Sequence, residues 1–376
     1  MQKFLSAALK VLLFLIPFLP LVVARSMVFP FITGKHFLFR VIIEIAAVLW
    51  AVLVLKFGTY KPKRSVILWA VLAFIVVIGL ADVFGEELYR SFWSNYERME
   101  GWFGLAHFIL YFVILAHTFT KEKEWLWFFY TSLGVSILLS IYGVFQLAGK
   151  LEIHQSGTRL DATLGNATYL AVYLLFHLYL LLLLFLRARE KWQKGLFAGL
   201  FVFESVILYH TATRGAILSF FISILFLAGW WVYQRKGTAR KWSALALGVL
   251  LVIPIGFYLL KDSSFVGQSE VLSRIRSISL AERTTQSRFI IWSMAYKGWK
   301  ERPILGWGQE NFSYVFSKYY DPRLWRQEPW FDRAHNIFFD WLIAGGAVGL
   351  LSYLAIFGAV GWVLTRLWKR GVVSAI

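Results

Sequence analysis

Residues 65–84 read SVILWAVLAFIVVIGLADVF, and this stretch decides the class of fold. Asp82 is its one charged residue. The hydrocarbon core of a bilayer is about 30 Å thick, and about 20 residues of α-helix are needed to cross it. A helix also satisfies its own backbone hydrogen bonds in lipid. Residues 65–84 are therefore predicted to form a membrane-spanning helix.

Comparable apolar runs recur along the chain. The 376 residues are 59% hydrophobic and 19% aromatic, a composition that would leave large apolar patches on a soluble protein. The sequence therefore predicts an all-α, polytopic bundle of about ten spans. The expected spans lie near Phe4–Val23, Phe37–Leu55, Ser65–Phe84, Gly104–Phe119, Leu126–Leu147, Ala167–Leu186, Gly195–His210, Ala216–Tyr233, Ser243–Leu260 and Ile337–Trp368.

The basic residues predict the orientation of these spans. Three loops and the tail, which share one side, are rich in lysine and arginine, around Arg64, Arg187, Arg240 and Arg370. By the positive-inside rule that side is cytoplasmic, and both termini lie on it. The net charge of +18 is thus attributed to membrane topology rather than to nucleic acid, and no nucleic-acid partner is expected.

Three regions follow from this orientation. Residues 1–260 are expected to hold the first nine spans, residues 261–335 a large outer loop, and residues 336–376 the last span and a cytoplasmic tail. Within the loop, residues 282–302 are predicted to form an amphipathic helix that Pro303 ends. Apolar residues of its mixed face are Phe289, Ile290, Trp292, Met294, Ala295 and Trp299.

Several kinds of chemistry lack their sequence signatures. The chain has no cysteine, which excludes disulfides, thiolate metal sites and a cysteine nucleophile. It has no phosphate-binding loop, no His-Glu-x-x-His and no Gly-x-Ser-x-Gly motif. No carboxylate cluster has the spacing of a metal site. No cofactor and no metal are therefore expected.

Arginines at the outer ends of the spans are the candidates for binding an anion. Arg214 lies in a very short turn between two spans, Arg159 in the loop before the sixth span, and Arg288 at the start of the amphipathic segment. Guanidinium groups bind phosphate through forked hydrogen bonds and stay charged. Each arginine could instead anchor a helix end at lipid headgroups. Arg98 and Arg333 are further candidates for substrate binding.

His335 is the candidate catalytic base. It opens the last apolar run together with Asn336, and Asp340 follows one helical turn later. The dipole at a helix start disfavours the imidazolium, whereas nearby carboxylates such as Asp332 favour it. A neutral imidazole could take a proton from an alcohol, and a protonated one would bind phosphate. Asp340 could orient the imidazole or pair with an arginine, and His335 could also be only an interfacial cap.

A pair of glycines follows the histidine at a fixed distance. The pattern is His335-Asn336-x9-Gly346-x-x-Gly349, and Gly345-x-x-x-Gly349 overlaps it. Small residues four apart allow two membrane helices to approach closely. The glycines are therefore predicted to serve helix packing and to break the last span near its outer end.

These motifs resemble the O-antigen ligase and polymerase superfamily of bacterial polytopic membrane glycosyltransferases. The resemblance is densest from Arg159 to Leu351. It rests on the His335 pattern and on Arg214-Gly-Ala-Ile-Leu218. It also rests on Ser287-Arg288-Phe-Ile-Ile-Trp292, followed by Arg302-Pro303-Ile-Leu-Gly306-Trp-Gly308. Such ligases often have about twelve spans rather than about ten. The sequence leaves open whether the chain is a fragment that lacks further spans.

The resemblance implies a reaction and its partners. A glycan on a polyprenyl pyrophosphate would be transferred to a hydroxyl acceptor, which could be a lipid A core, a glycan or a protein. The reaction would invert the anomeric centre without a metal, on the outer face of the bacterial cytoplasmic (inner) membrane. Arg214 and Arg288 would hold the pyrophosphate and His335 would activate the acceptor, with Arg159, Asn336, Asp340, Arg333 and Arg98 as further substrate-binding candidates.

Two kinds of alternative stay open at the level of sequence. A repeat-unit polymerase or a protein O-glycan ligase of the same superfamily would differ from a ligase only in the acceptor. A transporter or flippase of lipid-linked sugars would instead need charged residues near mid-membrane and paired broken helices in two halves. The charges here lie mostly at the outer edge, which favours the enzyme.

Overall fold

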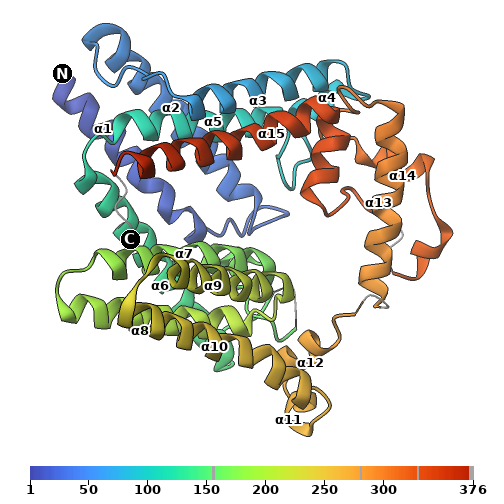
Figure 1. The fold of residues 1–376 in the computed structure, drawn as a ribbon. Helices are drawn as coiled ribbons and strands as arrows, with labels where there is room; N and C mark the ends of the chain where they lie inside the picture. The colour runs from blue at the N-terminus through green and yellow to red at the C-terminus, as the bar shows by residue number, and fades with distance from the viewer. Residues whose placement is uncertain (155–156, 280–281, 328–329, 372–376) are drawn as a thin grey trace. The chain divides into compact units, whose positions relative to one another are not determined.

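The computed structural model describes residues 1–154, 157–279, 282–327 and 330–371 (Figure 1). These residues form α-helices and short 3-10 helices, and no β-strand occurs among them, so the expected all-α class is confirmed. Eight helices in these ranges are long and apolar enough to cross a membrane. They are Gln2–Leu21, Thr33–Phe57, Val66–Val83, Glu122–Leu147, Ala167–Arg187, Arg214–Gln234, Gly237–Leu260 and Ile337–Lys369.

The ten expected spans all fall on helices, but two of them are not among these eight. Helix α5 (Trp102–Thr118) is apolar but has 17 residues, and α8 (Lys191–His210) has 20 residues and begins with polar ones. The polytopic helical architecture is thus confirmed, with eight spans of full length and apolarity in the described part of the chain.

The chain forms two compact units, residues 1–128 with 280–376 and residues 129–279. Unit 1 contains α1 (Gln2–Leu15), η1 (Ile16–Leu21), α2 (Thr33–Phe57), α3 (Val66–Val83), α4 (Leu88–Trp93), α5, α13 (Arg283–Glu301), α14 (Phe312–Lys318), η3 (Pro322–Arg326) and α15 (Ile337–Lys369). Unit 2 contains most of α6 (Glu122–Leu147), then η2 (Ala162–Leu164), α7 (Ala167–Arg187), α8, α9 (Arg214–Gln234), α10 (Gly237–Leu260), α11 (Ser264–Gln268) and α12 (Glu270–Arg276).

In unit 1 the last span packs along α3, and α5 also packs against α3 (Figure 1). The contact uses the glycines that the sequence singled out. A Cβ atom on Gly345 would lie 2.8 Å from Ile78 Cδ1, and one on Gly349 would lie 3.3 Å from the same atom. The small residues therefore let Ile78 of α3 pack against the backbone of α15, as the Gly-x-x-x-Gly spacing predicts.

A kink at Gly346 interrupts α15, so the predicted break is confirmed. Gly346 has φ 62° and ψ −161°, a backbone conformation that is open to glycine and strained for other residues. The segment 303–308 crosses α15 at this point. Trp307 N donates to Ile343 O at 2.7 Å, and Ala347 N donates to Pro303 O at 2.8 Å. The backbone groups freed by the break are thus satisfied by the loop.

We expect Gly346→Ala to destabilise the protein clearly. The new Cβ would lie 2.2 Å from Ile304 O, and the left-handed backbone alone costs about 1–3 kcal/mol for a residue with a side chain. The measurement is the melting temperature of the detergent-solubilised protein. Gly358→Ala, in the same helix with nothing within 4 Å of the added Cβ, is the matched control and should not lower that temperature. Equal melting temperatures for the two variants would contradict this account of the kink.

The segment before α15 folds around an apolar core of its own. The helix expected over 282–302 is present as α13, and it packs on α14 and on the start of α15. The buried side chains are Ile291, Met294, Ala295, Trp307, Phe312, Val315, Phe316, Leu324, Phe331, Ala334 and Ile343. Because Phe331 and Ala334 belong to this core, the backbone that leads to His335 is held in place.

Candidate functional site

In unit 2, Arg214 is the first residue of α9 and directly follows a tight turn. Helix α8 ends at His210, and the turn residues Thr211 and Thr213 are buried. Arg159 donates from Nε to Thr211 O and from Nη2 to Thr213 Oγ1, both at 3.0 Å. Arg159 therefore braces the turn that presents Arg214.

A buried polar cluster fixes the loop that carries Arg159. Asp161 is fully buried, and its Oδ1 accepts a hydrogen bond from Gln146 Nε2 at 2.7 Å at the end of α6. Its Oδ2 accepts from His154 N at 2.8 Å, and Gln146 Oε1 accepts from Ala162 N at 2.9 Å. These bonds fix the segment between α6 and α7 and so position the Arg159 side chain.

Two other guanidinium groups act on Arg159 in this part of unit 2. Burial lowers the pKa of Arg159, and the positive charges of Arg274 and Arg214 lower it further, whereas Glu270 raises it. Arg274 lies on α12, and its Nε is buried with no hydrogen-bond partner among the described residues. Arg159, Arg214 and Arg274 are called the arginine cluster below.

The sequence predicted Arg159 and Arg214 but missed Arg274. The signal available was weak, since Ser273-Arg274-Ile275-Arg276 is a short basic stretch in a polar loop. The other basic residue of that stretch, Arg276, pairs with Asp262 at 3.0 Å and so has a structural partner. Arg274 could be distinguished from Arg276 only by the position of its side chain in the fold.

In unit 1, His335 lies one residue before the N-cap of α15 and is exposed. Its φ is 52°, in the left-handed region that a non-glycine residue rarely adopts. The edge of its ring contacts Phe331, with the ring centroids 5.6 Å apart. The preceding residue is fixed as well, since Trp292 Nε1 donates to Ala334 O at 3.0 Å. The imidazole is thus presented on a constrained backbone.

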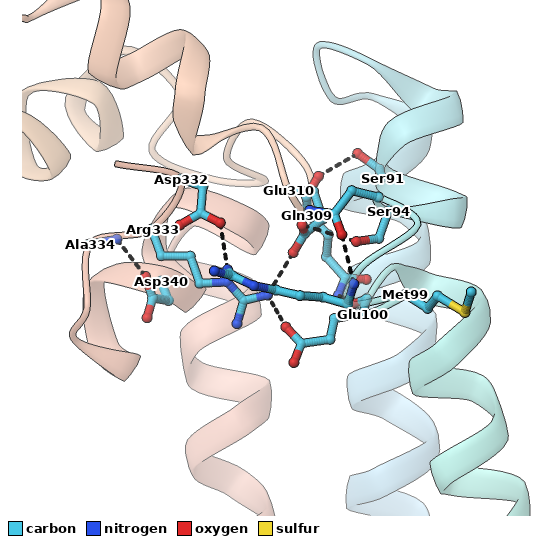
Figure 2. A network of polar contacts seen from close by, with 12 residues as sticks. Ser91, Ser94, Met99, Glu100, Gln309, Glu310, Asp332, Arg333, Ala334 and Asp340 are labelled. Carbon is cyan, nitrogen blue, oxygen red and sulfur yellow. Dashed lines mark hydrogen bonds and ion pairs between the residues drawn. The ribbon is translucent and has the colours of Figure 1, made fainter. Parts of the chain in front are cut away.

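Asn336 and Asp340 both serve the backbone around His335. The Asn336 side chain caps α15 by accepting from Phe338 N at 3.0 Å. Asp340 Oδ1 accepts from Ala334 N at 2.9 Å, which ties the first turn of the helix to the residue before His335 (Figure 2). The negative charge of Asp340 also raises the pKa of Arg333. Their predicted roles in substrate binding stay predictions.

The other two predicted arginines of this region are held by carboxylates. Arg333 Nη2 pairs with Glu310 at 2.8 Å and also with Glu100 (Figure 2). Arg98 pairs with Asp332. Burial lowers the pKa of Arg333, but Glu100 and Glu310 raise it more, and the result lies above the ordinary value. Glu100 lies 233 residues before Arg333 in the sequence, and the two meet only in the fold.

Arg288 lies in the second turn of α13 and is exposed. Among the described residues it has no ion-pair or hydrogen-bond partner. The structure therefore brings Arg159 and Arg214 together in unit 2, and it places Arg98, Arg333, Asn336 and Asp340 near His335 in unit 1. Arg214 belongs to unit 2, whereas Arg288 and His335 belong to unit 1. The expectation that all three line one cavity therefore stays a prediction.

These features define a multi-pass helical membrane protein with polar, charged side chains at the ends of its spans. Residues 199–354 match a family model described as O-antigen ligase. The resemblance to the O-antigen ligase and polymerase superfamily is thereby confirmed over this segment, and the match supports a membrane enzyme of that superfamily. The segment includes Arg214, Arg274, Arg288 and His335. Among curated proteins no match was found.

Proposed function

We propose that this protein is a glycosyltransferase of the ligase type, which moves a glycan from a polyprenyl pyrophosphate to a hydroxyl acceptor. The observation that carries the proposal is the arginine cluster, in which the charges of Arg214 and Arg274 act on Arg159 and the buried Nε of Arg274 has no hydrogen-bond partner among the described residues. Such a cluster is built for a multiply charged anion. The proposal takes a lipid-linked pyrophosphate as this anion, which is what the resemblance to O-antigen ligases implies.

The donor reacts because its leaving group is stabilised. Pyrophosphate carries negative charge that grows as the glycosidic C–O bond breaks. Positive groups positioned around that charge stabilise the transition state more than the ground state. We assign Arg214 and Arg274 to this role, with Arg159 bracing the turn of Arg214. Arg288 is assigned to the same pyrophosphate on the strength of the family resemblance.

The acceptor reacts because its hydroxyl is deprotonated as it attacks. His335, as a neutral imidazole, takes the hydroxyl proton while the oxygen forms a bond to the anomeric carbon of the donor. The bond from that carbon to the pyrophosphate oxygen breaks in the same step. Polyprenyl pyrophosphate leaves as the anion, and the proton stays on His335 until solvent removes it. One displacement of this kind inverts the anomeric centre and uses no metal.

Rival functions give different products. A repeat-unit polymerase would transfer one glycan to another, and a protein O-glycan ligase would use a side-chain hydroxyl. A lipid A core is the third class of acceptor. A flippase would move the donor across the bilayer with its glycosidic bond intact. Purified protein in nanodiscs, given a polyprenyl-pyrophosphate glycan and each acceptor without nucleotide, should form a glycosylated acceptor. An unchanged donor with every acceptor class would contradict the proposal.

We expect the reaction on the outer face of the cytoplasmic membrane. The chain has no cysteine, so single cysteines can be placed at will. Cysteines at positions 187 and 240 should react with an impermeant thiol reagent only after lysis of spheroplasts. Cysteines at positions 214 and 335 should react in intact spheroplasts. Reaction of the last two only after lysis would put the site in the cytoplasm and contradict both the topology and the mechanism.

A further inference from the structure

A cavity of about 280 Å³ lies in unit 1, next to the backbone that carries His335. Its polar wall consists of Glu100, Gln309, Glu310, Asp332, Arg333 and Asp340. Arg333 and Asp340 also flank His335 in the chain, and Asp340 holds the amide of Ala334. Ligand sites for small molecules have volumes of roughly 300–1,000 Å³. This cavity, called the unit-1 cavity below, therefore suits a group about the size of one sugar ring.

The charge of the unit-1 cavity argues against an anion. Four carboxylates line it, those of Glu100, Glu310, Asp332 and Asp340, against the single lining guanidinium of Arg333. Both Arg333 and its neighbour Arg98 already pair with these carboxylates. A pyrophosphate would meet a surplus of negative charge here, which like-charge repulsion disfavours. The phosphate end of the donor therefore belongs elsewhere.

Two polar groups of the unit-1 cavity lack partners in the described part of the chain. Gln309 is 7% exposed, and its backbone N is held by Asp82 Oδ1 at 2.7 Å while its side-chain oxygen Oε1 accepts nothing. The indole N–H of Trp341, which also lines the cavity, donates to nothing. Buried polar groups are normally satisfied, so an orphaned acceptor and an orphaned donor point to a ligand that supplies both. A hydroxyl is both donor and acceptor.

We propose that the unit-1 cavity binds one uncharged sugar residue of the acceptor, through its hydroxyl groups. The carboxylates accept hydrogen bonds from the hydroxyls, and Gln309 Oε1 and Trp341 Nε1 gain the partners that they lack. Leu105, Phe108 and Ile343 supply the apolar wall against which the ring packs. The inference rests on the proposed function and deepens it, because it assigns the acceptor to unit 1.

Protection of a single cysteine from alkylation tests this binding directly. Ile337 lines the cavity and is 47% exposed, whereas Ile304 is 66% exposed and lies outside the cavity lining. In the Ile337→Cys protein, methyl glycosides of neutral hexoses and of N-acetylhexosamines should slow alkylation by a water-soluble maleimide. The rate should fall about tenfold when the glycoside is present at about ten times its dissociation constant. Ile304→Cys, the matched control, should alkylate at the same rate throughout.

Three results of the protection experiment would overturn the inference. The first is that no glycoside slows alkylation of Ile337→Cys. The second is that inorganic pyrophosphate slows it more than any glycoside, which would make the cavity an anion site. The third is that a divalent cation alone protects the cysteine, which would assign the carboxylates to a metal ion.

Gln309→Met in the Ile337→Cys background tests the unpartnered oxygen. Methionine keeps the length of the side chain but removes the acceptor, so the glycoside concentration needed for protection should rise about tenfold. An unchanged rate of alkylation without glycoside shows that the variant is folded. Unchanged protection in a folded variant would contradict the role given to Gln309.

Leu105→Trp connects the unit-1 cavity with catalysis. The larger side chain fills the cavity from α5, so KM for the acceptor should rise about tenfold while KM for the donor stays the same. Leu351→Trp, at a 64% exposed position of α15 outside the cavity lining, is the control. Protection by glycosides without any glycan transfer would leave the cavity in place and reject the proposed function. Glycan transfer with a normal KM for the acceptor in Leu105→Trp would contradict acceptor binding in the unit-1 cavity, but it would not contradict the proposed function.

Discussion

His335→Ala is expected to lower the rate of glycan transfer by about 10²–10⁴-fold, the usual contribution of a general base. Donor binding should remain, because the proposal assigns the pyrophosphate to the arginine cluster and not to the histidine. The measurements are turnover under saturating donor and the affinity of the donor for the purified protein. Near-normal turnover would remove His335 from the role of base.

Two controls separate the loss of the base from a loss of structure. His335 has φ 52°, a conformation that asparagine adopts more readily than alanine, so His335→Asn should relieve any backbone strain and stay equally inactive. His117→Ala removes another imidazole, one whose Nδ1 contacts Val113 O at 2.7 Å in its own helix. That variant should keep nearly full turnover.

Arg214→Lys is expected to reduce kcat/KM for the donor by roughly 10- to 100-fold. Lysine keeps the positive charge but cannot form the two parallel hydrogen bonds of a guanidinium, and a hydrogen bond to a charged group is worth about 1.5–3 kcal/mol. A residue that only anchored the helix at lipid headgroups would tolerate the change. Donor affinity and turnover in nanodiscs distinguish the two roles.

The same helix supplies the control for Arg214→Lys. Arg235 follows the last residue of α9 and is exposed, at the opposite end from Arg214. Arg235→Lys should therefore leave donor affinity and turnover unchanged. If both variants behave like the parent protein, Arg214 returns to the role of a headgroup anchor. If both lose activity equally, the effect belongs to the helix and not to the phosphate site.

The membrane helices could be predicted because their signal is local. Residues 65–84 are apolar almost without interruption, and α3 occupies Val66–Val83 within them. The start of the last span was also predictable, since Asn336 is a good N-cap and α15 begins at Ile337. The break at Gly346 followed from the glycine pattern. In each case the relevant residues are close in sequence.

The packing of the outer segment was harder to predict. Phe289 was placed on the apolar face of the amphipathic helix, yet it is 44% exposed, while Ile291 is fully buried. Helix α13 buries Ile291, Met294, Ala295 and Gly298, and Val315 of α14 contacts Gly298. The buried face was thus decided by the partner helix and its glycine contact, which the mixed pattern of α13 alone does not reveal.

The candidate site shows the same limit. Arg159 and Arg214 were predicted because guanidinium groups at the outer ends of spans can bind phosphate, and Arg214 also lies in a very short turn. Glu100 was not connected with Arg333, because the two lie 233 residues apart in the sequence and meet only through the fold. Gln309 gave no sequence signal at all, since a glutamine becomes informative only when its burial and missing partner are known.

The anomeric configuration of the product tests the central claim most directly. A donor with a defined configuration at the carbon bound to pyrophosphate is converted by the purified protein, and the new linkage is assigned by nuclear magnetic resonance. One displacement by a hydroxyl that His335 deprotonates predicts complete inversion, together with one free polyprenyl pyrophosphate for each linkage formed. A product with retained configuration would require a covalent glycosyl-enzyme intermediate, and it would contradict the mechanism proposed for Arg214 and His335.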